Sequence, residues 1–107
     1  MINVKDSVRF KRITIEMLKL ETVIEETWKP ITGKDATMTS GNDSSHMAGS
    51  KHFEDQARDF RTKDLSEPQK DSIYQVLKNK LSPLGYDVVF EARGKVNEHL
   101  HIEYDPK

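Results

Sequence analysis

The chain contains no cysteine, and this absence excludes several kinds of chemistry. Without cysteine a protein has no disulfide, no thiolate ligand for a metal ion and no thiol nucleophile. Any metal site must therefore use histidine and carboxylate side chains. The chain also lacks an apolar run long enough for a signal peptide or for a membrane span, which needs roughly 18 apolar residues. We expect a protein that is cytoplasmic as synthesised and is not inserted in a membrane.

The chain also lacks an excess of charge of either sign. It has 17 basic and 18 acidic residues, a formal net charge of -1, and basic residues that are scattered along its length. Proteins that bind nucleic acid usually carry a basic patch or stripe, so we expect no nucleic-acid partner. At 107 residues with 35% hydrophobic residues, the chain is long enough for one modest core. We expect a single domain over residues 1–107 and favour a monomer.

Apolar periodicity predicts two helices. Between residues 13 and 28 the apolar side chains recur every three or four positions, and Pro30 is expected to end that helix. Residues 66–69, Ser-Glu-Pro-Gln, form a capping-box pattern with proline in the first turn, which predicts the start of a second helix. We expect Pro83 and Gly85 to close it.

Four strands are predicted around these helices, over residues 36–39, 56–61, 86–90 and 99–104. This order of elements predicts an α+β domain in which two main helices cover one face of a small antiparallel sheet. The opposite face of the sheet would then be free to carry a site.

All four histidines fall in two short segments, with His46 and His52 in the first and His99 and His101 in the second. Imidazole is the commonest protein ligand of zinc, and a hydrolytic zinc site needs three protein ligands. Strand alternation places His99, His101 and Glu103 on one face of the last strand, opposite the apolar residues that we expect in the core. Solvated histidines on an exposed sheet face are the alternative explanation.

Two acidic residues extend this pattern. Asp59 lies in the middle of a predicted strand, where carboxylates are disfavoured, and a metal ion would explain its position. Glu98 precedes His101 by three residues, at the start of the last strand, where a carboxylate could serve as a general base. A solvated glutamate in a turn is the alternative for Glu98.

Taken together, these segments resemble a known superfamily. The run Ser50-x-His52, Ala57-x-Asp59 and Glu98-x-x-His101 resembles the SxHxxGxAxD and ExxH motifs of the D-Ala-D-Ala metallopeptidases, which include phage endolysin peptidases. The segments SKHFEDQARDFRTKDL and GYDVVFEARGKVNEHLHIEY are also similar to the hedgehog signalling domain, which shares that fold and zinc site. The resemblance covers residues 40–104.

The resemblance implies a hedgehog/DD-peptidase-like fold with one zinc ion. The zinc ligands that it implies are His52, Asp59 and His101. It also implies that Glu98 is the general base of a peptidase, and that His46 and His99 line the zinc cleft without binding the metal. In a peptidase, such histidines could donate a hydrogen bond to the scissile carbonyl or stabilise the oxyanion of the tetrahedral intermediate.

The sequence departs from the family pattern at three places. Asp55 stands where the motif has glycine, so the backbone there differs or an added carboxylate lies near the metal. Asn42 and Asp43 follow Ser-Gly where the peptidases commonly carry an arginine that holds a substrate carboxylate. We therefore favour an endopeptidase over a carboxypeptidase. Apart from Asp43 and Glu16, the acidic cluster of the hedgehog calcium site is unmatched, so we expect no calcium.

The leading interpretation is a zinc metallopeptidase of the D,D- or L,D-type, phage or bacterial, that hydrolyses peptidoglycan cross-links or stem peptides. Its partner would be a peptide or peptidoglycan, and another factor would have to release it to the cell wall. A different interpretation is a hedgehog-like zinc domain that binds a peptide or a partner with little or no hydrolysis. The third interpretation is a zinc-free α+β domain whose histidines are solvated.

Overall fold

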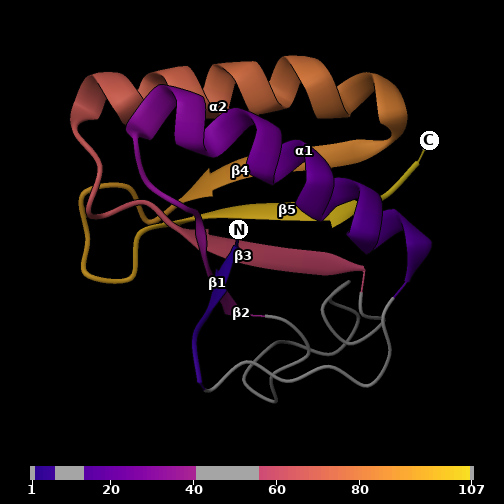
Figure 1. Ribbon diagram of the computed structural model, residues 1–107, viewed down its shortest axis with the longest axis horizontal. Coiled ribbons are helices and arrows are strands. Elements are labelled where there is room, and N and C mark those ends of the chain that lie inside the picture. The colour runs from indigo at the N-terminus through magenta and orange to yellow at the C-terminus, as the bar shows by residue number, and fades with distance from the viewer. Residues whose placement is uncertain (1, 7–13, 41–55, 107) are drawn as a thin grey trace.

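The computed structural model describes residues 2–6, 14–40 and 56–106, which form two α-helices and a five-stranded sheet (Figure 1). The α-helices are α1 (Ile15–Thr32) and α2 (Glu67–Leu81), and a short 3-10 helix, η2 (Ser82–Leu84), follows α2. The strands are β1 (Asn3–Val4), β2 (Thr37–Ser40), β3 (Ala57–Arg61), β4 (Tyr86–Glu91) and β5 (His99–Tyr104). The predicted α+β class is confirmed.

The sheet has the strand order β1-β2-β3-β5-β4, and it is mixed instead of wholly antiparallel as predicted. The pairs β2–β3, β3–β5 and β5–β4 are antiparallel, whereas β1 runs parallel to β2. The backbone carries the β1 pairing, through bonds from Asn3 N to Ala36 O (2.8 Å) and from Lys5 N to Met38 O (2.9 Å). Because both β1 side chains are exposed, the sequence has no apolar alternation there to reveal a strand.

Helix α1 continues two residues beyond Pro30, where the sequence predicted its end. Pro30 removes one helical hydrogen bond, that to the carbonyl of Glu26, but the last turn is still closed by two other bonds. Thr32 Oγ1 donates to Trp28 O at 2.8 Å, and the amide of Gly33 donates to Lys29 O at 2.8 Å. Gly33 has a φ of 73°, the left-handed conformation that commonly ends a helix.

Helix α2 begins with the predicted capping box. The amide of Gln69 donates to Ser66 Oγ (3.3 Å), and the amide of Ser66 donates to Gln69 Oε1 (3.0 Å). The helix then passes into η2 and ends at Gly85, whose φ is 95°. The predicted closing residues Pro83 and Gly85 therefore lie where the chain turns into β4.

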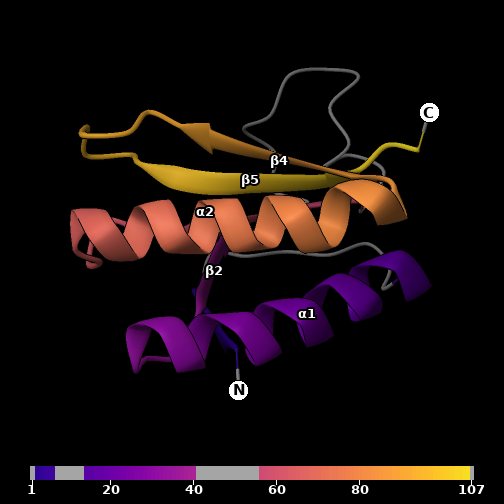
Figure 2. The ribbon, with the colours of Figure 1, turned by 90° about the horizontal axis from the view of Figure 1, so that it is seen from above.

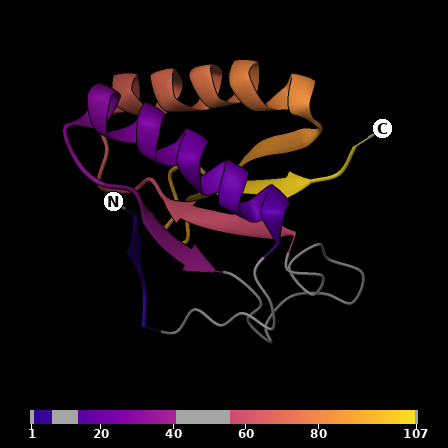
Figure 3. The same cartoon turned by 45° about the vertical axis from the view of Figure 1, so that its right-hand side comes forward.

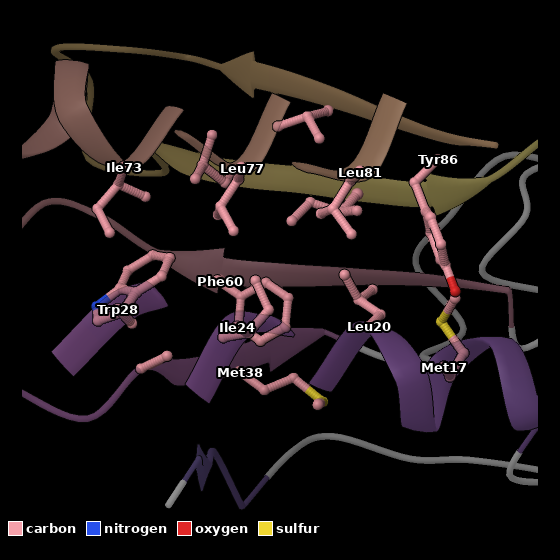
Figure 4. Packing of buried hydrophobic residues seen from close by; sticks show 14 of the residues in the cluster. Met17, Leu20, Ile24, Trp28, Met38, Phe60, Ile73, Leu77, Leu81 and Tyr86 are labelled. Atoms are coloured by element: carbon pink, nitrogen blue, oxygen red, sulfur yellow. The ribbon is translucent and has the colours of Figure 1, made fainter. Parts of the chain in front are cut away.

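Both helices cover the same face of the sheet, as predicted. They run side by side in opposite directions (Figure 2), and an oblique view shows them above the strands (Figure 3). The core between the layers is formed by apolar residues from both helices and from alternate strand positions (Figure 4), which include Met17, Leu20, Ile24, Trp28, Met38, Phe60, Ile73, Leu77, Leu81, Leu100 and Ile102. Within the described residues, neither helix combines the length and the apolar character that crossing a membrane requires.

Candidate metal centre

The candidate site lies on the face of the sheet that points away from the helices. Phe60 and Leu100 are directly paired across β3 and β5 and are fully buried beneath the helices. The neighbouring pair, Asp59 and His101, therefore points to the opposite face, because side chains alternate along a strand. This open face also carries Glu103, two residues further along β5, as the sequence predicted.

Asp59 and His101 are in direct contact. Asp59 Oδ1 lies 2.8 Å from His101 Nδ1, and the two side chains are only 9% and 13% exposed. The second ring nitrogen of His101, Nε2, lies 2.7 Å from Glu103 Oε1. The burial of His101 lowers its pKa, but the hydrogen bonds to Asp59 and Glu103 outweigh this effect and raise the pKa to about 9. Without a metal ion, the ring is therefore an imidazolium at neutral pH.

His99 lies beside this pair. Its Nδ1 is 2.7 Å from the carbonyl oxygen of Asn97, and its Nε2 is 3.3 Å from Glu91 Oε1 and 3.9 Å from Asp59 Oδ2. The ring is 22% exposed. Its Nε2 edge therefore faces both the Asp59 carboxylate and the open face.

Glu91 is a residue of this site that the sequence analysis missed. It ends β4 and is paired with His99 on β5. Its Oε1 lies 3.7 Å from His101 Nδ1, the same ring nitrogen that contacts Asp59, and its side chain is 47% exposed. The predicted strand ended at residue 90, one residue short of Glu91, so the sequence pattern did not place Glu91 opposite His99.

Glu98, the predicted base, makes its contacts on the helix side. Its Oε1 accepts hydrogen bonds from Lys70 Nζ of α2 (2.8 Å) and from the amide of Gly94 (3.0 Å), and its Oε2 accepts one from Thr62 Oγ1 (2.5 Å). The residue is 4% exposed. Burial raises the pKa of Glu98, but the three hydrogen bonds and the Lys70 charge outweigh it and lower the pKa to about 2.

These contacts separate Glu98 from the predicted ligands. Adjacent residues of an extended chain point to opposite faces, and Glu98 directly precedes His99. The contact with Lys70 holds the Glu98 carboxylate against α2, whereas His99 and Asp59 face the open side. The ExxH motif therefore does not bring Glu98 and His101 to the same face of the sheet here.

Three of the residues singled out in the sequence, His46, His52 and Asp55, lie outside the described residues. The structure thus brings together two of the three predicted zinc ligands, Asp59 and His101. It also brings the predicted cleft residue His99 to the same face.

A carboxylate cluster adjoins the site on the same face. Asp87 and Glu103 are directly paired across β4 and β5, and Asp105 follows β5. Ligand oxygens of these three residues lie within 4.8 Å of one another, so the cluster could hold a metal ion, although exposed acidic groups often lie this close without one. It is the one set of three such ligands among the residues that the structure describes.

No protein-family model matches the chain, and no curated protein or solved structure matches it. The superfamily resemblance therefore rests on the motifs, and the function that it implies has to be argued from the site.

Proposed function

We propose that this chain is a zinc-dependent peptidase that hydrolyses a peptide bond of peptidoglycan. One zinc ion would be held by His52, Asp59 and His101. The observation that carries the proposal is the 2.8 Å approach of Asp59 Oδ1 to His101 Nδ1 on a sheet face that the helices leave open. Carboxylate oxygen and imidazole nitrogen are the ligands that a catalytic zinc site without cysteine requires.

The Asp59 and His101 pair fits such an ion. Two ligand atoms of one tetrahedral zinc ion lie roughly 3.3 Å apart, so the pair needs only a small side-chain adjustment. Both side chains are largely buried, and a buried carboxylate in mid-strand is costly unless it is paired. A bound zinc ion would supply Lewis acidity toward an amide carbonyl and toward water.

Glu91 is the better candidate for the general base. A base needs a free lone pair within reach of the attacking water, and Glu91 lies beside His101 Nδ1 with its side chain half-exposed. Glu98 has three donors on its two oxygens and a pKa of about 2, which makes it a weak proton acceptor. The protonated form of His99, with Nδ1–H on the Asn97 carbonyl and Nε2–H toward Asp59, could donate a hydrogen bond to the carbonyl oxygen of the substrate.

A second candidate function is a hedgehog-like zinc domain that binds a peptide with little or no hydrolysis. The observation that favours it is the engagement of Glu98, the glutamate of the ExxH motif, by Lys70, Thr62 and the Gly94 amide. In that case the open face would bind zinc and a ligand, and Glu91 would have no role as a base.

The test is hydrolysis of purified peptidoglycan and of its stem peptides by zinc-loaded protein, with chelated protein as the control. We expect the wild type to cleave in a zinc-dependent way. Glu91→Gln should reduce the rate by about 10²-fold or more while the protein keeps its zinc. Glu98→Gln should keep the activity per folded molecule. Zinc binding without cleavage would favour the binding domain. A wild type that binds no zinc would overturn both candidates, and the reverse ranking of the two variants would restore Glu98 as the base.

A further inference from the structure

The ring of His101 is held at both of its nitrogens. Asp59 Oδ1 lies 2.8 Å from Nδ1, and Glu103 Oε1 lies 2.7 Å from Nε2. The two carboxylates reach the ring from different strands, because Asp59 is directly across from His101 on β3 and Glu103 is two residues along β5 on the same face. A half-turn of the ring would put Cδ2 in place of Nδ1 and Cε1 in place of Nε2, and would therefore break both contacts.

We propose that Glu103 is a positioning residue that directs His101 Nδ1 toward the metal. This inference rests on the proposed zinc site. A histidine can bind zinc through either nitrogen, and the nitrogen that does so is set by the hydrogen bond that the other one makes. Since Nε2–H donates to Glu103, the ring presents Nδ1 on the side of Asp59. Zinc binding would displace the Nδ1 proton to solvent, and the Nε2 proton would stay on its bond to Glu103.

The surroundings of Glu103 support this role. Its side chain is only 25% exposed, and ligand oxygens of Glu103, Asp87 and Asp105 lie within 4.8 Å of one another. Carboxylates that lie this close repel one another, so the position of Glu103 is unfavourable unless a cation or a donor compensates it. The Nε2–H of His101 supplies that donor, and a carboxylate in this position also makes the ring a stronger ligand.

The first readout is zinc affinity, measured by competition with a chromogenic chelator. We expect Glu103→Ala to weaken zinc binding about 10- to 100-fold, as loss of a carboxylate behind a ligating histidine usually does. Glu103→Gln should restore part of the affinity, because its amide oxygen can still accept from Nε2–H. The matched control is Asp105→Asn, which removes one charge from the same cluster and should change the affinity by less than about threefold.

The second readout is the bonding state of the ring, measured by nitrogen-15 NMR of the zinc-loaded protein. In the wild type we expect His101 to bind through Nδ1 with Nε2 protonated, and in Glu103→Ala we expect this signal to weaken or to be mixed with the other form. The spectra also show whether each variant is folded. If Glu103→Ala does not fold, the same comparison is made with Glu103→Gln.

Three outcomes would overturn the inference and leave the proposed zinc site standing. Coordination through Nε2 in the wild type would contradict it directly. Unchanged zinc affinity in both Glu103 variants would contradict it while leaving the zinc site intact. An equal loss of zinc affinity in Asp105→Asn would assign the effect to the total charge of the cluster and not to the hydrogen bond between His101 and Glu103. A wild type that binds no zinc would remove the proposed function as well.

Discussion

Asp59 and Glu98 are both buried carboxylates, and their partners give them different roles. Asp59 lies on the open face against His101 Nδ1, whereas Glu98 lies on the helix side with Lys70, Thr62 and an amide as donors. A buried carboxylate is tolerated only when it is paired and hydrogen-bonded, and both residues meet that condition. At the scale of single residues, Asp59 is the carboxylate that we propose as a zinc ligand, and Glu98 fastens the start of β5 to α2.

We predict that Glu98→Gln lowers the free energy of unfolding by about 1–3 kcal/mol at pH 7, since it removes a charged acceptor from buried donors. The folded-state pKa of Glu98, about 2, is below its ordinary value of 4.5. Its contribution is therefore fully present above pH 4.5 and is lost as the pH falls toward 2. Urea unfolding of both proteins across this range should show their difference shrinking with acid. A difference that stays constant would contradict the assignment.

The protonation of His101 gives a second prediction, for metal-free protein. Its pKa of about 9 is above the ordinary value of 6.5, so its contribution to stability is fully present below pH 6.5 and is lost as the pH rises through 9. NMR titration of the ring in the presence of a chelator should give a midpoint near pH 9. Asp59→Asn should move that midpoint down, because it removes the charge beside Nδ1. A wild-type midpoint near 6.5 would show that the ring is not held between the two carboxylates.

At the scale of elements, the start of α2 is joined to the turn between β4 and β5. Arg93 of that turn forms ion pairs with Asp71 (2.8 Å) and Glu67 (3.2 Å) of α2, and its guanidinium lies 4.9 Å from the ring centre of Phe90. Glu67 also pairs with Lys70, the residue that binds Glu98. The first two turns of α2 thus help to fix the register of the two strands that carry His101 and Glu91.

The capping box that starts α2 gives the third prediction. Ser66→Ala should lower the free energy of unfolding by about 1 kcal/mol, because it leaves a helix-terminal amide without its acceptor. The matched control is Ser72→Ala, an exposed position within α2, where alanine should be neutral or slightly stabilising. Equal effects of the two substitutions in urea unfolding would mean that the cap contributes nothing.

Periodicity predicted the elements well where burial determines the pattern. Strand β5 and the start of α2 lie where alternation and the capping box put them. Strand β1 was not predicted because only its backbone is paired. Helix α1 passes Pro30, and its last turn is closed by the bonds that Thr32 and Gly33 donate. Tertiary packing decides which group a buried carboxylate contacts, and the contact between Glu98 and Lys70 is an example. Spacing alone therefore pointed to Glu98 as the base and did not reveal Glu91.

At the scale of the whole molecule, the sheet has one apolar face under the helices and one polar face with the candidate site. A ligand that binds only the folded state stabilises it. We predict that zinc at about 100 times its dissociation constant raises the free energy of unfolding by about 2.7 kcal/mol, and that a chelator reverses the gain. Asp59→Ala should abolish the gain, whereas Glu98→Gln should keep it. A gain that survives Asp59→Ala would place the ion elsewhere.

Anomalous diffraction from zinc-loaded crystals would show directly where the proposed zinc ion binds. We predict one zinc peak bound by Asp59 Oδ1 and His101 Nδ1, with His52 as the third protein ligand. A peak among Asp87, Glu103 and Asp105 with none at Asp59 would contradict the claim, and so would the absence of any peak on the open face.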